Sequence, residues 1–342
     1  MTCLLTAGCA LVAGLAFLAS PAAPLPDAPI ASATSCSAGS VAAVIGGKHA
    51  CLKTGRACKT KLDQQYHRYR FHCHNGRLTR SPKPSSVYSA KVDVGGYRLA
   101  IRCRGTGTPT VVLESGFDSP GAVWSLVQPK VASTTRVCSY DRAGVGDSDP
   151  RKPAGPVPAT RVVEDLHTLL TRANIAPPYV LGGWSFGGFF VRFYTKRYPD
   201  EVRGLVSVDG TPAGLPPGRP DIDLVEGDHE SFYMAAADAE VAASPDLGAR
   251  PLVVLTRGKG DATPDLEALW LKLEKQVARL STSSILVRAD NSGHAIVTDN
   301  PLLTAEAFRQ VIAAVRNGAT LPPCAETPLP RLNGTCLDPN SP

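Results

Sequence analysis

The sequence predicts an α/β fold in which helices cover both faces of a mostly parallel sheet. From about Val87 onward, short apolar runs alternate with amphipathic segments, as strands joined by helical crossovers do. The apolar runs have the length of buried strands, and the amphipathic segments have the spacing of helices that bury one face. The chain has 342 residues, whereas a domain usually has ~100–200. We therefore expect one large domain with an appendage.

The expected elements follow one another from residue 97 to residue 316. Strands are expected at 97–102, 110–114, 136–140, 179–182, 205–208, 252–256 and 284–288. Helices are expected at 159–173, 186–198, 264–280 and 303–316, with Pro301 near the start of the last one. No internal repeat is visible in the sequence.

The positive charge of the chain is concentrated in one short stretch. The formal net charge is +6. Residues 37–91 contain eleven Lys and Arg residues but a single acidic residue, Asp63, and the remainder of the chain has a slight negative balance. Hydrophobic residues make up 43% and charged residues 19% of the chain. These are values of a globular protein, and they exclude a wholly disordered one.

Residues 1–33 predict a signal peptide. They are apolar at first and then rich in Pro and Ala. Ala31 and Ala33 provide the small residues for cleavage before Thr34, and a second site near Ala22 competes with it. No Lys or Arg precedes the apolar run, so an uncleaved membrane anchor is the alternative. The sequence thus predicts a secreted protein, or else one anchored to a membrane by its N-terminal segment.

Residues 34–80 predict a cysteine-rich basic module, followed by a linker at 81–89. Of the ten cysteines, eight remain without the leader, an even number suited to disulfides. The module is too short to bury an adequate apolar core alone. It resembles small four-cysteine modules attached to exported bacterial proteins. We expect two disulfides in it, and the three possible connectivities stay open. The cysteines concerned are Cys36, Cys51, Cys58 and Cys73.

Aromatic and basic side chains alternate along residues 66–74 of this module. Such a composition suits a surface for polyanions or glycan polymers, which predicts contact with a cell wall or a polyanion through residues 48–80. In the alternative, the aromatic side chains pack a small core while Arg and His are solvated. A zinc site of three of the cysteines and His74 is a further possibility, but the paired Cys-x-x-Cys spacing of zinc knuckles is missing.

The strongest signal for chemistry is the motif GWSFGG at residues 183–188. It follows a predicted strand and precedes a predicted helix, which is the context of a nucleophile elbow. Glycines on either side of Ser185 let strand and helix pass close to each other at the strained turn. The serine oxygen would then lie at a helix N-terminus, which favours developing negative charge. The alternative is a chance glycine-rich helix start, since G-x-S-x-G by itself is common.

Together with four other segments, this motif resembles the α/β-hydrolase family. The segments are VVLESGF at 111–117, YDRAGVGDS at 140–148, the link at 198–209 and NSGH at 291–294 with Asp299 and Pro301 after it. The resemblance covers roughly residues 90–318. It implies a mostly parallel sheet of the eight-stranded type flanked by helices, with a short lid at about 211–249. Residues 319–342 then form a C-terminal tail.

The resemblance also assigns the remaining groups of a catalytic triad. His294 alone combines a loop after the last strand, a preceding glycine and the family's chain order of Ser, acid and His; its alternative is an exposed loop histidine. The family's acid most often follows the seventh strand, where this sequence has Asp261, and in some relatives the sixth, where it has Asp209. Asp261 is slightly preferred. By analogy, the backbone N–H groups of Phe117 and Phe186 form the oxyanion hole.

Two further cysteine pairs lie in the larger domain and its tail. Cys103 and Cys138 fall on strands that are neighbours in the family's sheet, so a disulfide and two buried thiols are both compatible with the sequence. Cys324 and Cys336 are expected to close a short loop of the tail by a disulfide.

The sequence therefore predicts a carboxylic ester hydrolase that works through an acyl-enzyme on Ser185. The partner is a small-molecule ester-type substrate, and no metal or organic cofactor is called for. Neither a specific nucleic acid nor a transmembrane partner is expected. An exported peptidase or a lipase with the same triad is the alternative within this chemistry, and a non-catalytic cell-wall binding protein is the alternative outside it.

Overall fold

The computed structural model describes residues 36–37, 39–67, 69, 71–80, 87–212, 224–226, 228–233, 239, 241, 247–260 and 262–341. The predicted leader lies outside these residues, and so do Asp261 and most of the predicted linker and lid. Within the described part of the chain, no helix combines the length and the apolar character needed to cross a membrane.

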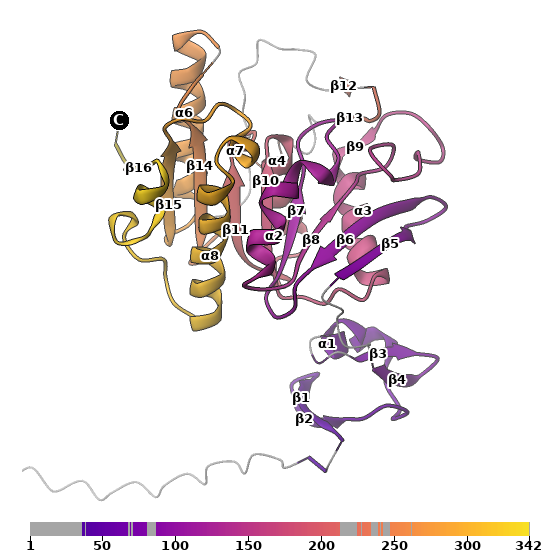
Figure 1. Ribbon diagram of the computed structural model, residues 1–342. Coiled ribbons are helices and arrows are strands. Elements are labelled where there is room, and N and C mark those ends of the chain that lie inside the picture. The colour runs from indigo at the N-terminus through magenta and orange to yellow at the C-terminus, as the bar shows by residue number, and fades with distance from the viewer. Residues whose placement is uncertain are drawn as a thin grey trace, which may run out of the picture.

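The larger domain is built on a nine-stranded sheet (Figure 1). Across the sheet the strands are β16 (Gly334–Leu337), β15 (Ser284–Ala289), β14 (Leu252–Arg257), β11 (Val202–Val208), β10 (Tyr179–Trp184), β7 (Thr110–Glu114), β8 (Val137–Tyr140), β6 (Arg98–Arg104) and β5 (Val87–Asp93). The strands from β15 to β8 pair in parallel, whereas β16, β6 and β5 pair antiparallel. The mostly parallel sheet expected from the sequence is confirmed.

Helices cover both faces of this sheet. One core takes apolar residues from α3 (Ala159–Arg172), α4 (Phe186–Arg197) and α6 (Pro264–Arg279). The other takes them from α2 (Gln128–Ala132), α7 (Ile296–Asp299) and α8 (Pro301–Asn317), and Figure 1 shows α2 and α8 on the side nearer the viewer. Successive strand residues point to opposite faces, so Val180 enters one core and Leu181 the other. Central strands that feed two cores need the near-continuous apolar runs seen in the sequence.

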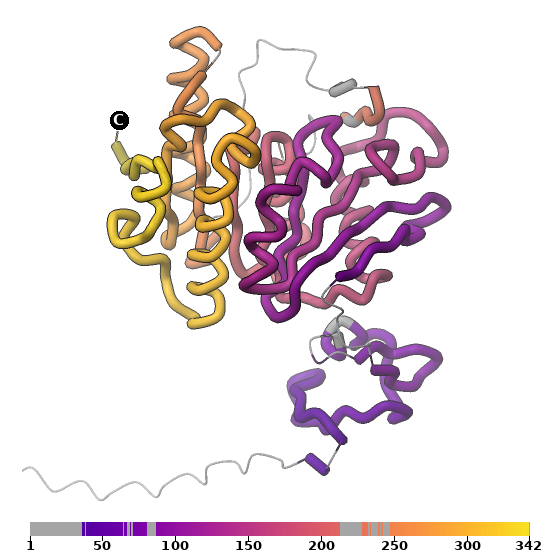
Figure 2. Tube along the Cα trace, in the orientation of Figure 1, coloured from indigo at the N-terminus to yellow at the C-terminus, as the bar shows by residue number. Residues whose placement is uncertain are grey.

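Two edge strands form where no strand is expected from the sequence. β5 alternates exposed and half-buried residues, so it lacks the apolar run of a buried strand. β16 belongs to the tail, pairs with β15 and is fixed by the Cys324–Cys336 disulfide. In Figure 2 the yellow tail runs beside the orange part of the chain. The seven expected strands and four expected helices all form, with ends within three residues of the expected ones.

The cysteine-rich module has a small core of its own. Two hairpins, β1 (Val41–Ile45) with β2 (Lys48–Leu52) and β3 (Phe71–His74) with β4 (Arg77–Arg80), accompany the short helix α1 (Asp63–His67). The core contains Tyr66 and Phe71, as expected if the aromatic residues of 66–74 pack inside. Disulfides join Cys36 to Cys51 and Cys58 to Cys73, which takes the thiolates that a zinc site would need.

Two short strands come from the predicted lid, and one of them pairs with the larger domain. β12 (Leu224–Glu226) and β13 (Ser231–Tyr233) form an antiparallel pair, and β13 adds to β9 (Val157–Pro158) in parallel. The β13 segment of the predicted lid is therefore attached to the larger domain just before α3. The same domain also holds the Cys103–Cys138 disulfide, between residues that face each other on β6 and β8.

Candidate active site

Ser185 lies in a sharp turn between β10 and α4. The strand ends at Trp184 and the helix begins at Phe186, so one residue makes the turn. Its backbone has φ 55° and ψ −127°, a region that residues other than glycine rarely adopt and that costs about 1–3 kcal/mol. A Cβ on Gly183 would lie 2.2 Å from the carbonyl oxygen of Gly187, so this crossing of strand and helix requires glycine. The serine is thus presented on the strained turn that the motif predicts.

His294 joins Ser185 to a buried carboxylate. It lies in the loop that follows β15, and the Trp184 Nε1–H group donates to its carbonyl oxygen at 2.8 Å. Nδ1 of His294 lies 2.6 Å from Oδ2 of Asp209, and Nε2 lies 2.9 Å from Oγ of Ser185. A carboxylate accepts only, so the ring proton belongs on Nδ1. Nε2 is then free to accept the hydrogen bond from the Ser185 hydroxyl.

Asp209 follows β11 directly and is fully buried, with φ 43°. Its Oδ1 accepts from the backbone N–H of Arg257 and from Nε1–H of Trp270, both at 3.0 Å. Its Oδ2 accepts from Nη1–H of Arg257 at 3.0 Å as well as from His294. Four donors therefore surround a carboxylate that would otherwise be costly to bury. They also fix the plane of the carboxylate relative to the imidazole.

Arg257 and Trp270 support this carboxylate and were not singled out by the sequence. Arg257 ends β14, and its guanidinium lies 4.5 Å from the centroid of the Trp270 ring, on α6. Glu267 accepts from Nε–H of Arg257 at 3.0 Å. Burial disfavours the charge of Arg257, but Glu267 and Asp209 outweigh burial and raise its pKa. A charged residue at the carboxyl end of a predicted parallel strand is a signal that could have identified Arg257, whereas Trp270 looks like any apolar residue of an amphipathic helix.

Glu274 is a second carboxyl group close to Asp209. It lies on α6 with no exposed surface. Burial, and next the negative charge of Asp209, raise the pKa of Glu274 well above its usual value. The charges of Arg192 and Arg257 and the backbone of Gly210 offset this only in part. Burial and the neighbouring Asp209 thus both favour the neutral form of Glu274 over its carboxylate.

Phe117 and Phe186, the two residues expected at the oxyanion hole, lie side by side next to Ser185. Phe117 follows β7 by three residues, and Phe186 is the first residue of α4. Their ring centroids are 5.6 Å apart. A Cβ on Gly116 would lie 3.1 Å from Cβ of Ser185, so the loop after β7 packs against the serine turn. The first N–H groups of α4 also lie at this point, since Ser185 is the N-cap residue of the helix.

The structure therefore brings Ser185, His294 and Asp209 together from three different strand ends. Asp261, the slightly preferred acid, lies outside the described residues. The two candidate aspartates follow β11 and β14, which are adjacent and parallel, so both strands end at the same edge of the sheet. The sequence could place an acid at this edge but could not choose the strand that carries it.

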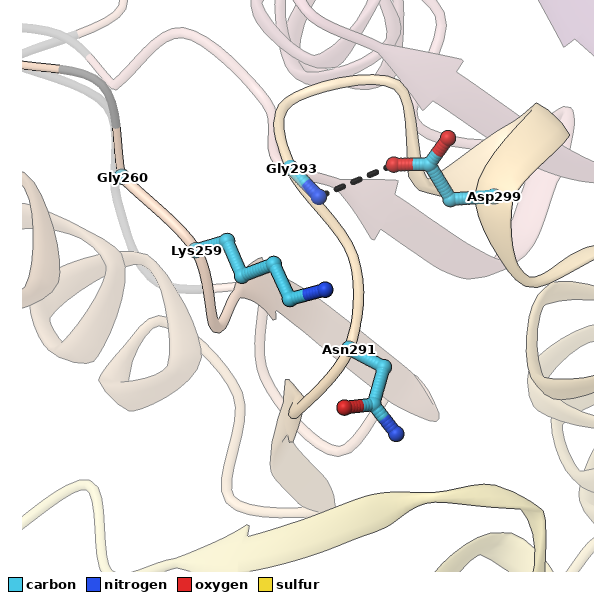
Figure 3. A pocket seen from close by; sticks show the side chains of 5 residues that line it. All are labelled: Lys259, Gly260, Asn291, Gly293 and Asp299. Carbon is cyan, nitrogen blue, oxygen red and sulfur yellow. Dashed lines mark hydrogen bonds between the residues drawn. The ribbon is translucent and has the colours of Figure 1, made fainter.

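A shallow pocket of about 540 Å³ lies beside the His294 loop. Figure 3 shows Lys259 and Asn291 at its wall and the carboxylate of Asp299 directed at Gly293. The Gly293 N–H group donates to Oδ2 of Asp299 at 2.9 Å, which braces the turn just before His294. The triad residues themselves do not line this pocket. We do not assign it to the substrate.

Fold and site together define the class of the protein. The sheet order, the strained serine between strand and helix and the late histidine loop are those of α/β hydrolases. The model of the alpha/beta hydrolase fold family matches residues 109–301, which is more than half of the chain. The chain belongs to this family.

Curated relatives share modest sequence identity with the chain. The uncharacterized protein YqjL of Bacillus subtilis (strain 168) is 25% identical over 229 residues, which are 64% of this chain and 89% of that protein. An AB hydrolase superfamily protein of Gibberella zeae is 22% identical over 285 residues, covering 61% of this chain and 87% of the relative. Other relatives match over less of their length, such as a probable transporter of Hormonema carpetanum, of which 18% is covered.

Solved structures of the same fold include esterases and a phospholipase. A thermophilic esterase from Thermogutta terrifontis has a TM-score of 0.51 and 20% identity, over 68% of this chain and 99% of the esterase. A bacterial membrane phospholipase A has a TM-score of 0.51 and 19% identity, over 68% and 87% of the two chains. Likeness at these identities shows the fold alone.

Proposed function

We propose that this protein is a serine hydrolase that cleaves carboxylic esters, with Ser185 as nucleophile, His294 as base and Asp209 as acid. The observation that carries the proposal is the row of two hydrogen bonds, from Ser185 to Nε2 of His294 and from Nδ1 of His294 to Asp209, at 2.9 and 2.6 Å. A serine hydroxyl is a weak nucleophile until a base accepts its proton. This row supplies the base and orients it.

In the proposed reaction Oγ of Ser185 attacks the carbonyl carbon of the ester while its proton passes to Nε2 of His294. Asp209 stabilises the imidazolium that results. The oxyanion accepts hydrogen bonds from the backbone N–H groups of Phe117 and Phe186. The alcohol leaves with the proton from His294, and an acyl-enzyme remains. Water then attacks the acyl-enzyme with the same histidine as base, and the carboxylic acid is released.

The chain's disulfides support secretion. Four disulfides are present among the described residues, and such a content is typical of an extracellular or otherwise oxidising environment. We propose that residues 1–33 direct the chain there as a cleaved signal peptide. The alternative, an uncleaved membrane anchor, differs in the length of the mature chain, which mass spectrometry of the exported protein measures.

We also propose that the basic module contacts a polyanion or the cell wall through residues 48–80. The exposed side chains that support this include Lys48, Lys53, Arg56 and Lys59. Positive charges concentrated on a small module attract polyanions through long-range electrostatics.

Hydrolysis of p-nitrophenyl acetate and butyrate by the purified protein tests the enzymatic proposal. Ser185→Ala should abolish turnover, and Ser133→Ala, an exposed serine on the same domain, serves as the matched control. A fluorophosphonate probe should label the wild type but not Ser185→Ala. Background turnover that persists in Ser185→Ala, without labelling of the wild type, would favour the non-catalytic binding protein. Peptide and long-chain lipid substrates, assayed in parallel, separate the peptidase and lipase alternatives.

A further inference from the structure

A buried group of charges lies behind the loop that carries Phe117. It consists of Arg142, Glu114 and Glu230, whose side chains are 3%, 1% and 6% exposed. Glu114 ends β7, Arg142 follows β8 by two residues, and Glu230 comes from the predicted lid. Three segments that are distant in sequence therefore meet at one guanidinium. Burying charged side chains to this extent costs free energy, which points to a role other than stability for these three residues.

The Arg142 guanidinium uses all five of its N–H groups. Nε–H donates to Glu230 at 2.7 Å, and one Nη2–H donates to the other carboxylate oxygen at 2.5 Å. One Nη1–H donates to Glu114 at 2.5 Å. The two that remain donate to backbone carbonyls of the loop, to Ser115 at 2.8 Å and to Gly116 at 2.5 Å. The planar fork of arginine thus holds two consecutive peptide groups in fixed orientation.

The hydrogen bond from Arg142 to the carbonyl oxygen of Gly116 determines the direction of the Phe117 N–H group. The carbonyl of Gly116 and the N–H of Phe117 belong to one planar trans peptide group, in which C=O and N–H point in opposite directions. Because Arg142 holds this carbonyl, the N–H of Phe117 is directed away from Arg142. A donor that points in a fixed direction before substrate arrives needs no reorganisation in the transition state.

Residues 228–230 of the predicted lid form hydrogen bonds with Asp118, the residue after Phe117. Asp118 N–H donates to Glu230 at 2.6 Å, and the Asp118 carboxylate accepts from the N–H groups of Asp228 and His229 at 3.0 and 3.1 Å. Asp118 has φ 55°, so the loop turns sharply at this residue. Gly144 approaches the carbonyl oxygen of His229 so closely that a Cβ there would lie 2.2 Å away. Residues 228–230 are therefore bonded to the oxyanion loop at three backbone groups.

We propose that Arg142 is the positioning residue of the oxyanion hole, and that Glu230 carries this function into the lid by holding Arg142 and the end of the Phe117 loop together. The inference rests on the proposed esterase function. Neither residue touches substrate. Both act through the direction of the Phe117 N–H group, so the efficiency of the oxyanion hole depends on whether residues 228–230 are in place.

Glu230→Gln, Asp118→Asn and Arg142→Lys test this role by steady-state kinetics. Glutamine and asparagine keep the size of the side chain but weaken the bonds to Arg142 and to the lid, and lysine lacks the planar fork. We expect kcat to fall about 10- to 100-fold while KM stays within about threefold. A trifluoromethyl ketone, which forms an oxyanion on the serine, should lose affinity by the same factor as kcat/KM. Loss of packing alone would not produce this split.

Two matched controls lie elsewhere in the domain. Glu201→Gln alters a carboxylate bonded to Tyr194 and His167, and Arg250→Lys alters a guanidinium that donates to three backbone carbonyls. Both should keep wild-type kcat. If Arg142→Lys does not fold, Glu230→Gln and Asp118→Asn decide the question.

The outcomes separate the two levels of the proposal. If the wild type and Ser185→Ala have the same turnover, the esterase function itself is wrong. If the wild type is active through Ser185, but folded Glu230→Gln and Asp118→Asn retain its kcat and its affinity for the trifluoromethyl ketone, only the positioning role is overturned.

Discussion

At the scale of single residues, the carboxylate of Asp209 is the most constrained group of the site. It accepts two hydrogen bonds from Arg257, one from Trp270 and one from His294. An imidazole that must accept a proton needs a partner of fixed direction, since a wrong tautomer or a rotated ring breaks the row. The residues around Asp209 provide that direction from β14 and α6. The choice of acid can therefore be tested by one pair of variants.

Asp209→Asn should lower kcat by roughly 10³–10⁴-fold, because the amide no longer holds the proton on Nδ1 of His294. Asp261→Asn should leave kcat within about threefold of the wild type. The measurement is steady-state hydrolysis of p-nitrophenyl butyrate by the two variants, with folding checked by thermal unfolding. The reverse order of effects would return the role of acid to Asp261.

The buried carboxyl group of Glu274 should make the free energy of unfolding depend on pH. Its pKa is raised in the folded protein, so the native state holds a proton that the unfolded chain releases above its usual value of 4.5. The free energy of unfolding therefore falls as pH rises from 4.5 towards the raised pKa of this group. Glu274→Gln removes that loss.

Urea unfolding of the wild type and Glu274→Gln at pH 5, 6, 7 and 8 measures this effect. The advantage of Glu274→Gln over the wild type should grow with pH. The exposed Glu326→Gln is the control and should show a constant difference. A constant difference for Glu274→Gln as well would mean that the buried carboxyl ionises at its ordinary pH.

At the scale of elements, the crossing of β10 and α4 leaves no room for a side chain at Gly183. Gly183→Ala would place a Cβ 2.2 Å from a backbone oxygen of the helix, and overpacking of this kind costs about 1–3 kcal/mol or more. We expect a lower Tm and weaker labelling of Ser185. Gly293→Ala, where the nearest atom would be 3.7 Å away, is the control. A wild-type Tm for Gly183→Ala would show that strand and helix can move apart.

The sequence predicts those elements whose own residues show an apolar run or a turn motif. β7 and β10 are apolar along their length because both faces are covered, and α4 begins at the glycine-rich turn. β5 and β16 lack such a run and form because a neighbouring strand offers hydrogen bonds. The same distinction decides which residues of the candidate site could be predicted from the sequence. Ser185 and His294 stand in local motifs and Arg257 lies at the end of a predicted strand. Trp270 and Glu230 acquire their roles only through contacts between distant segments.

At the scale of the whole molecule, the charge of the chain is divided between two bodies. The module at residues 34–80 has nine basic residues and one acid, while the larger domain is slightly acidic. If the module binds polyanions, its affinity for an immobilised sulfated glycan should fall steeply as salt is raised, because bound counterions are released. The full chain should elute from such a column at a salt concentration set by the module.

Replacing Lys48, Lys53 and Lys59 together by Gln should lower that elution point. The control replaces three exposed lysines of the larger domain, Lys152, Lys259 and Lys272, and removes the same net charge. Chromatography of both triple variants separates a local surface from the total charge. Equal shifts of the two variants would contradict a binding surface in the module.

The tail strand β16 has one more consequence. It occupies the side of β15 that would otherwise be the border of the sheet, and the Asp290 N–H group donates to Asn333 at 3.0 Å just beyond the pair. A strand whose N–H and C=O groups have no neighbour is a template on which another copy can assemble. β16 is then itself the edge strand on this side, but it has four residues where β15 has six, and the Cys324–Cys336 bond closes its segment. The tail therefore shortens the open edge on this side, which disfavours association between folded copies in concentrated solution.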